Sequence, residues 1–124
     1  MANGTIKKNV ANALVETTGY FNANINTDYV QNSNLYWNKI GNILFIKGWL
    51  SLKAVSIPAG ATLFTIGEFT AGQNSVVPGY SNTNPVSEIL NGWIEGATNV
   101  VKSRYAYHPS QTTAFQLDAS IILR

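Results

Sequence analysis

The chain has 124 residues and a mass of 13.5 kDa, which suits a single domain. Charged residues make up 11% of it, against about 25% in an ordinary soluble domain, and the net charge is only +2. Its eight Lys and Arg residues are scattered rather than clustered, so neither nucleic acid nor an anionic membrane surface is an expected partner.

Cysteine is absent and histidine occurs once, which excludes disulfides, thiolate metal sites and the multi-histidine sites of zinc enzymes. We therefore expect no metal and no other cofactor. Residues 1–9 hold no apolar signal-peptide core, and no apolar run approaches the ~20 residues of a membrane span. The sequence predicts neither a signal peptide nor insertion into a membrane.

The first half of the chain predicts short strands. Val10–Val15 is the one stretch with helical periodicity, and its β-branched residues weaken that interpretation. Tyr20–Ile25 alternates with a period of two, as a half-buried strand does. Leu35–Leu52 predicts a β-hairpin, because Gly41-Asn42 lies between two apolar, aromatic segments.

The second strand of this hairpin is apolar on both faces. One face consists of Leu44, Ile46, Gly48, Leu50 and Leu52, and the other of Ile43, Phe45, Lys47, Trp49 and Ser51. The second face is therefore expected to be core beneath a second sheet or a contact between subunits.

A turn at Ile57-Pro58-Ala59-Gly60 leads into a predicted strand over Ala61–Ile66. The following stretch, Gly67–Pro85, is rich in Gly, Asn, Ser and Pro and predicts a long loop. Such a loop in a small domain is usually functional or packed on itself.

The last third of the chain predicts three strands. Val86–Ile94 and Val100–Tyr107 flank the Gly-containing connection at 95–99 and form a second hairpin. Thr112–Leu123 is the last strand, and its core face consists of Thr113, Phe115, Leu117, Ala119 and Ile121. About seven short strands separated by turns predict one all-β domain, an antiparallel β-sandwich or small closed barrel spanning 1–124.

Three segments, in this order, resemble a known family. They are Lys39-Ile40-Gly41-Asn42-Ile43, Ile46-Lys47-Gly48 and the strand from Ala59 to Ile66, followed by a Pro-containing loop. The succession over residues 30–124 is similar to the C-terminal head domains of receptor-binding proteins and tail fibres from phages of Gram-positive, lactic-acid-type bacteria.

The resemblance implies a compact, jelly-roll-like head that is usually a homotrimer and adheres to a host cell-wall or surface saccharide without covalent chemistry. It places residues 31–124 in the head and leaves 1–30 as a connecting segment or first strand. It further implies a location at the tail tip or baseplate of the virion, contact with other tail or baseplate proteins, and synthesis in the host cytoplasm.

A sugar site needs flat aromatic faces ringed by planar hydrogen-bonding groups. Two places supply them, and the candidate ligand-binding residues are Arg104, Tyr105, Tyr107, His108, Trp93 and Glu95. A regular hairpin would hold Trp93 and Glu95 at its turn end and the other four at its far end. Two arrangements are then open: the far-end group forms a site with residues of Gly67–Pro85, or a trimer interface brings the two ends together from neighbouring chains. We favour the far-end group.

Catalytic arrangements are poorly supported. Glu88 and Glu95 bracket a strand, and a glycosidase would need two such carboxyls facing one sugar. Ser110, His108 and Asp118 supply triad residue types without the surrounding motif of a known hydrolase. We expect no enzyme; the alternatives are a structural baseplate or capsid decoration module and, less favoured, a saccharide depolymerase.

Overall fold

The computed structural model describes residues 16–21, 24–82 and 88–124. Within them the chain forms eight β-strands: β1 (Glu16–Tyr20), β2 (Val30–Ile40), β3 (Ile43–Leu52), β4 (Thr62–Thr65), β5 (Ser75–Ser81), β6 (Ile89–Ile94), β7 (Val100–Ser103) and β8 (Thr113–Ile122). The possible helical turn at Val10–Val15 lies outside the described residues.

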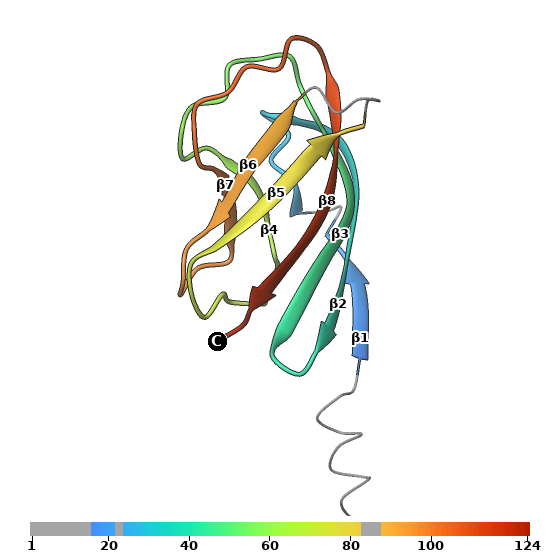
Figure 1. The fold of residues 1–124 in the computed structure, drawn as a ribbon, viewed down its shortest axis with the longest axis vertical. Coiled ribbons are helices and arrows are strands. Elements are labelled where there is room, and N and C mark those ends of the chain that lie inside the picture. Colours follow the sequence, from blue (N-terminus) through green and yellow to red (C-terminus); the bar gives the residue numbers. More distant parts are fainter. Residues whose placement is uncertain (1–15, 22–23, 83–87) are drawn as a thin grey trace, which may run out of the picture.

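All eight strands belong to one antiparallel sheet, in the order β1-β2-β3-β8-β5-β6-β7-β4. The sheet curls into a half-barrel (Figure 1). This confirms the all-β, antiparallel prediction. No second sheet exists among the described strands, so the expectation that Ile43, Phe45 and Trp49 are core beneath one is wrong; they lie on the outer face, half-buried or exposed.

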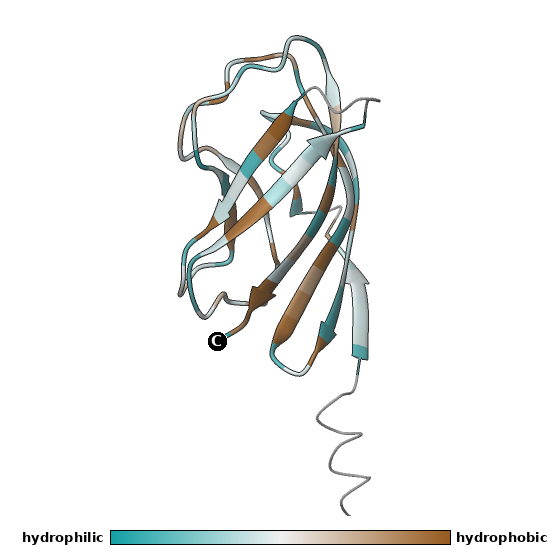
Figure 2. Ribbon diagram, in the orientation of Figure 1, coloured by the Kyte–Doolittle hydropathy of each residue, from teal (hydrophilic) through white to brown (hydrophobic). Residues whose placement is uncertain are grey.

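The core fills the inside of the curl. Burial alternates along β3 and β8, and hydrophobic residues are concentrated on these central strands (Figure 2). On β3 the predicted inner face is fully buried, with Leu44, Ile46 and Leu50 at 0% exposure. The predicted inner face of β8 is buried likewise. Burial on this scale stabilises the fold by roughly 1.5–3 kcal/mol per large apolar side chain.

The predicted hairpin at Leu35–Leu52 is confirmed as β2 and β3, with Ile40 opposite Ile43 across the turn. Gly41 at the turn has a φ of 60°. Glycine at the first central position is what a type II′ hairpin turn requires, and such a turn matches the twist of the two strands. The local sequence therefore sets the register of the longest hairpin in the sheet.

The long loop predicted at Gly67–Pro85 is wrong, because β5 lies within it and pairs with both β6 and β8. Pro78 is tolerated in this inner strand because its β8 pairing starts only at Gly79, so the missing N–H breaks no bond on that side. A Cβ on Gly79 would lie 3.1 Å from the Cβ of Phe115, so glycine permits close packing there. Pro78 and Gly79, which are unfavourable in most strands, made this strand resemble a loop in the sequence.

Several strand boundaries also differ from the prediction; β2, for example, begins at Val30 rather than Leu35. The first strand is Glu16–Tyr20 rather than Tyr20–Ile25, and Ile25 forms only an isolated bridge to Phe64 of β4. Val100–Tyr107 is shorter than predicted, since β7 ends at Ser103. The bridge at Ile25 brings the two ends of the sheet toward each other.

Candidate functional site

A groove of about 370 Å³ crosses the outer face of β5 and β6 and reaches the bend after β7. The pairing places Val76 opposite Trp93, Pro78 opposite Asn91 and Tyr80 opposite Ile89, all on the outer face. We call this hollow the β5–β7 groove; its lining residues are Val76, Pro78, Tyr80, Ile89, Asn91, Gly92, Arg104 and Tyr105.

Apolar side chains on this face remain open to solvent. Val76 is 56% exposed, Ile89 52%, Tyr80 49% and Tyr105 58%. Scattered single residues of this kind need no explanation, but a contiguous apolar patch rimmed by polar groups marks a binding site. The two phenol rings supply flat faces within the same groove.

Arg104 provides the charged group. Its guanidinium carbon lies 4.2 Å from the ring centroid of Trp93 and 5.7 Å from that of Tyr105, so the cation is stacked on aromatic faces. Its backbone N–H donates to the Asn91 carbonyl at 2.8 Å, which fixes where the side chain starts. Among the described residues it forms no ion pair, so its donors remain available.

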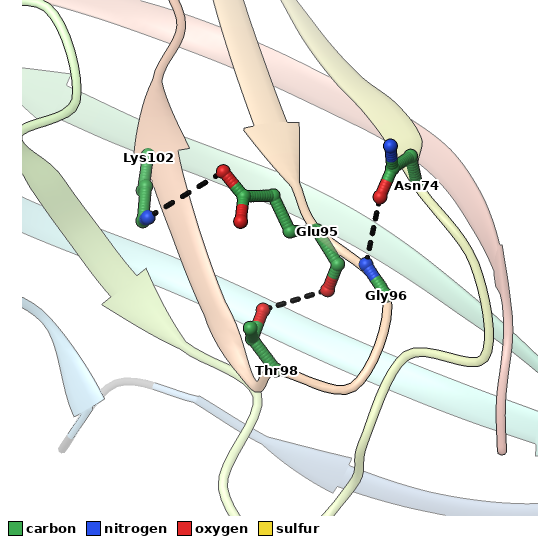
Figure 3. Close-up of polar contacts among 5 residues, drawn as sticks. All are labelled: Asn74, Glu95, Gly96, Thr98 and Lys102. Atoms are coloured by element: carbon green, nitrogen blue, oxygen red, sulfur yellow. Dashed lines mark hydrogen bonds and ion pairs between the residues drawn. The ribbon is translucent and has the colours of Figure 1, made fainter.

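Glu95 lies beside the groove but is engaged at the β6–β7 turn (Figure 3). Its carboxylate is 3.8 Å from the Lys102 ammonium, and its backbone carbonyl accepts a hydrogen bond from the Thr98 hydroxyl at 2.7 Å. The Gly96 N–H donates to the Asn74 side chain at 2.9 Å and holds the same turn. Lys102 is thus neutralised locally, whereas Arg104 is not.

The expected separation of Trp93 from Arg104 is wrong. The register pairs Trp93 with Lys102 and Gly92 with Ser103, so Arg104 starts only one step beyond and reaches diagonally across to the indole. The β6–β7 register therefore brings Trp93 of one predicted group to Arg104 of the other, whereas Tyr107 and His108 lie elsewhere. The groove also brings Arg104 and Tyr105 together with Val76, Pro78 and Tyr80 from the Gly67–Pro85 stretch.

Tyr107 and His108 lie away from this groove, in a separate hollow with Ile57 and Pro58. The Tyr107 ring packs edge-on against Phe115 with centroids 6.1 Å apart, and its hydroxyl oxygen is buried. His108 is exposed, with its Nδ1 3.0 Å from the Ser56 hydroxyl. Tyr107 and His108 therefore lie in the hollow beside Ile57 and Pro58 and not in the β5–β7 groove with Arg104.

The groove residues that the sequence analysis missed come from β5 and the start of β6. Val76, Pro78 and Tyr80 alternate with the buried Val77, Gly79 and Ser81, a period-two signal that the Pro and Gly obscured. The strand pattern was therefore present in the sequence.

The carboxyl pair considered for glycosidase chemistry is too far apart. Glu88 and Glu95 lie just before and just after β6, seven residues apart, which at about 3.3 Å per residue is about 23 Å. Glycosidase carboxyls are about 5–9.5 Å apart. No group of three or more potential metal ligands occurs within residues 16–21, 24–82 and 88–124. In the same part of the chain no helix is long and apolar enough to span a membrane.

No protein-family model matches the sequence, and no curated protein is similar to it in sequence. The fold does resemble a solved structure. It matches the crystal structure of the receptor binding protein (gp15) of Listeria phage PSA with a TM-score of 0.64, covering 98% of this chain and 73% of that one. The identity over the match is 14%, so the likeness is one of fold.

Proposed function

We propose that this chain is a receptor-binding domain from the tail of a phage. Its fold is shared with a phage receptor binding protein over nearly its whole length. The order of its hairpin motifs, read from the sequence alone, resembles the same class of head domains. The fold and the order of the sequence motifs each support the same role. A place in the virion tail and contact with neighbouring tail or baseplate proteins follow from that role.

The ligand we propose is a host cell-surface saccharide bound in the β5–β7 groove. The observation that carries this is the Arg104 guanidinium stacked 4.2 Å from the Trp93 ring at the rim of an aromatic hollow. Stacking orients the planar fork so that its N–H donors can pair with hydroxyl or acidic oxygens. Tyr80 and Tyr105 offer flat faces for the C–H surface of a sugar ring. Glu95 acts indirectly, by neutralising Lys102.

Binding without covalent chemistry is the role the carboxylate positions favour. The separation of Glu88 and Glu95 opposes a depolymerase built on that pair. In this proposal the adhering protein holds a sugar weakly at each groove and gains strength from several identical subunits. We propose a homotrimer, in which the exposed Ile43 and Ile122, paired across β3 and β8, contact a neighbouring subunit.

The test is binding of purified cell walls from a panel of Gram-positive bacteria, Listeria included. Arg104→Ala is expected to weaken binding about 10- to 100-fold, as loss of charge-assisted hydrogen bonds does. Arg104→Lys should recover only part of it, because an ammonium lacks the planar fork. Arg124→Ala removes the same charge outside the groove and should bind like the parent.

Folding of each variant is checked by circular dichroism before binding is compared. Equal binding by Arg104→Ala and the parent contradicts the site, and failure of the parent to bind any wall contradicts the function. Release of reducing sugar from a bound wall would instead identify a depolymerase.

A further inference from the structure

A second groove, of about 340 Å³, lies over β1, β2 and β3 on the same outer face of the sheet. Tyr20, Tyr36 and Lys47 form one row across these three strands. We call it the β1–β3 groove; its lining residues are Glu16, Thr18, Gly19, Tyr20, Tyr36, Trp37, Asn38 and Lys47. Its size is that of a small-molecule site rather than a flat contact surface.

Two tyrosines form its apolar part. Tyr20 is 72% exposed and Tyr36 42%, and their rings meet at 61° with centroids 6.5 Å apart. This edge-to-face arrangement is a stable one, so the two rings hold each other at an angle. The result is a pair of differently inclined aromatic faces, both open to solvent.

The polar part of the groove is already ordered. The Asn38 side-chain amide donates to Glu16 Oε1 at 2.9 Å, across the β1–β2 pair. The second amide hydrogen and the other carboxylate oxygen are left for further hydrogen bonds. Glu16 and Lys47 carry opposite charges, so the groove is neutral as a whole. A neutral ligand rich in hydroxyl groups fits this arrangement better than an ion.

The two grooves are separate sites. In the strand order, the β1–β2 pair lies four strand spacings from the β5–β6 pair, which is about 19 Å along the sheet. Tyr20 lies four residues and two strands from the level of Ile43, about 16 Å away.

We propose that the β1–β3 groove is a second saccharide site, which binds a neutral sugar unit between Tyr20 and Tyr36 with hydrogen bonds to Asn38 and Glu16. This rests on the proposed function, since both grooves would engage one cell-surface polymer. Attachment at two points of one subunit, four strand spacings apart along the curved sheet, raises the effective concentration of each interaction without any new contact.

The experiment is an amide-resolved NMR titration of the labelled full chain with single sugars. The probes are glucose, galactose and N-acetylglucosamine, with glucuronic acid as the charged comparison. At least one neutral sugar is expected to shift the amides of Gly19 and Tyr20 in a saturable manner. Removing one aromatic contact in Tyr20→Ala should weaken this about 2- to 10-fold or abolish it. Tyr20→Phe, which keeps the ring, should retain it.

Controls separate the two grooves. Arg104→Ala should leave the Gly19 shifts unchanged, and so should Val55→Ala, which replaces an exposed apolar residue outside both grooves. Asn38→Ala, which removes the ordered amide, gives a second test that does not depend on Tyr20. The proposal is overturned if no neutral sugar shifts these amides, if Tyr20→Ala and Asn38→Ala shift as the parent does, or if glucuronic acid binds equally well.

Failure of this site is distinguishable from failure of the proposed function. Cell-wall binding that is lost in Arg104→Ala but unchanged in Tyr20→Ala keeps the receptor-binding role and removes the second site. Cell-wall binding unaffected by either variant or by the double variant removes both.

Discussion

Tyr107 carries a buried polar atom at a place where the sequence suggested a ligand contact. Its hydroxyl oxygen has no hydrogen-bond partner within the described residues. Burial raises the pKa of Tyr107 above its ordinary value, and the neighbouring Glu88 carboxylate raises that pKa further. Glu88 is held in turn by the Thr113 hydroxyl, 3.2 Å from its Oε2. The phenol therefore has to stay neutral in the folded protein.

This predicts a loss of stability at alkaline pH. Above about pH 10 the unfolded chain releases the Tyr107 proton while the folded chain keeps it, so the free energy of unfolding falls as pH rises. Tyr107→Phe should reduce this fall, because it removes the group whose proton release differs between the folded and unfolded chains. Urea denaturation of parent and variant at several pH values measures the free energy of unfolding. A parallel decline for parent and variant would contradict this account.

At the scale of elements, one asparagine links the two ends of the sheet. The backbone N–H of Asn26 donates to the Leu63 carbonyl at 2.8 Å, and its side-chain amide donates to the Thr62 carbonyl at 2.9 Å. Its side-chain oxygen accepts from the Asp28 N–H at 3.1 Å. Asn26 thus makes two hydrogen bonds to β4, the edge strand at the end of the sheet opposite β1.

Asn26→Ala should therefore lower the free energy of unfolding by about 1–3 kcal/mol, because a partly buried carbonyl loses its donor. Asn32→Ala is the matched control: the Asn32 side chain is exposed and bonds only the adjacent Ser33 N–H, so its removal should cost less than about 0.5 kcal/mol. Thermal or urea denaturation compares the two. Similar losses would mean that Asn26 does not hold the ends together.

The elements that the sequence predicted well are those whose pattern is local. Burial alternates along β3 and β8 with a period of two, and Gly41 marks the turn between β2 and β3. β5 was missed because Pro78 and Gly79 weaken its propensity, and what makes it a strand is pairing with β6 and β8. A short stretch of sequence does not reveal pairing between strands that are distant along the chain.

The candidate site was found in part for the same reason. Arg104 and Tyr105 stand out by residue type, and the structure places both in the β5–β7 groove. The contact of Arg104 with Trp93 depends on the β6–β7 register, which pairs Trp93 with Lys102, two residues before Arg104. Tyr107 could not be told from a surface aromatic, because its burial comes from Phe115 on a distant strand.

At the scale of the whole molecule, no described strand covers the outer face of β3 and β8. Ile43 and Ile122 lie opposite each other and are 37% and 43% exposed. The proposed homotrimer would bury them, so Ile43→Asp should convert trimers to monomers by placing a charge in an apolar contact. Light scattering at micromolar concentration measures the mass. A parent protein that is already monomeric would contradict the trimer.

The position of β8 has a consequence for how the protein is made. The strand latest in the sequence lies inside the sheet, between β3 and β5, and joins the two halves. Until the ribosome has released Thr113–Ile122, the β1–β3 unit and the β5–β6 hairpin each present an open strand edge with no partner. The sheet therefore cannot be completed before Thr113–Ile122 has been synthesised, and its completion depends on contacts distant in sequence, which form slowly. A nascent chain stalled before Thr113 would be prone to pair with its neighbours on the same polysome.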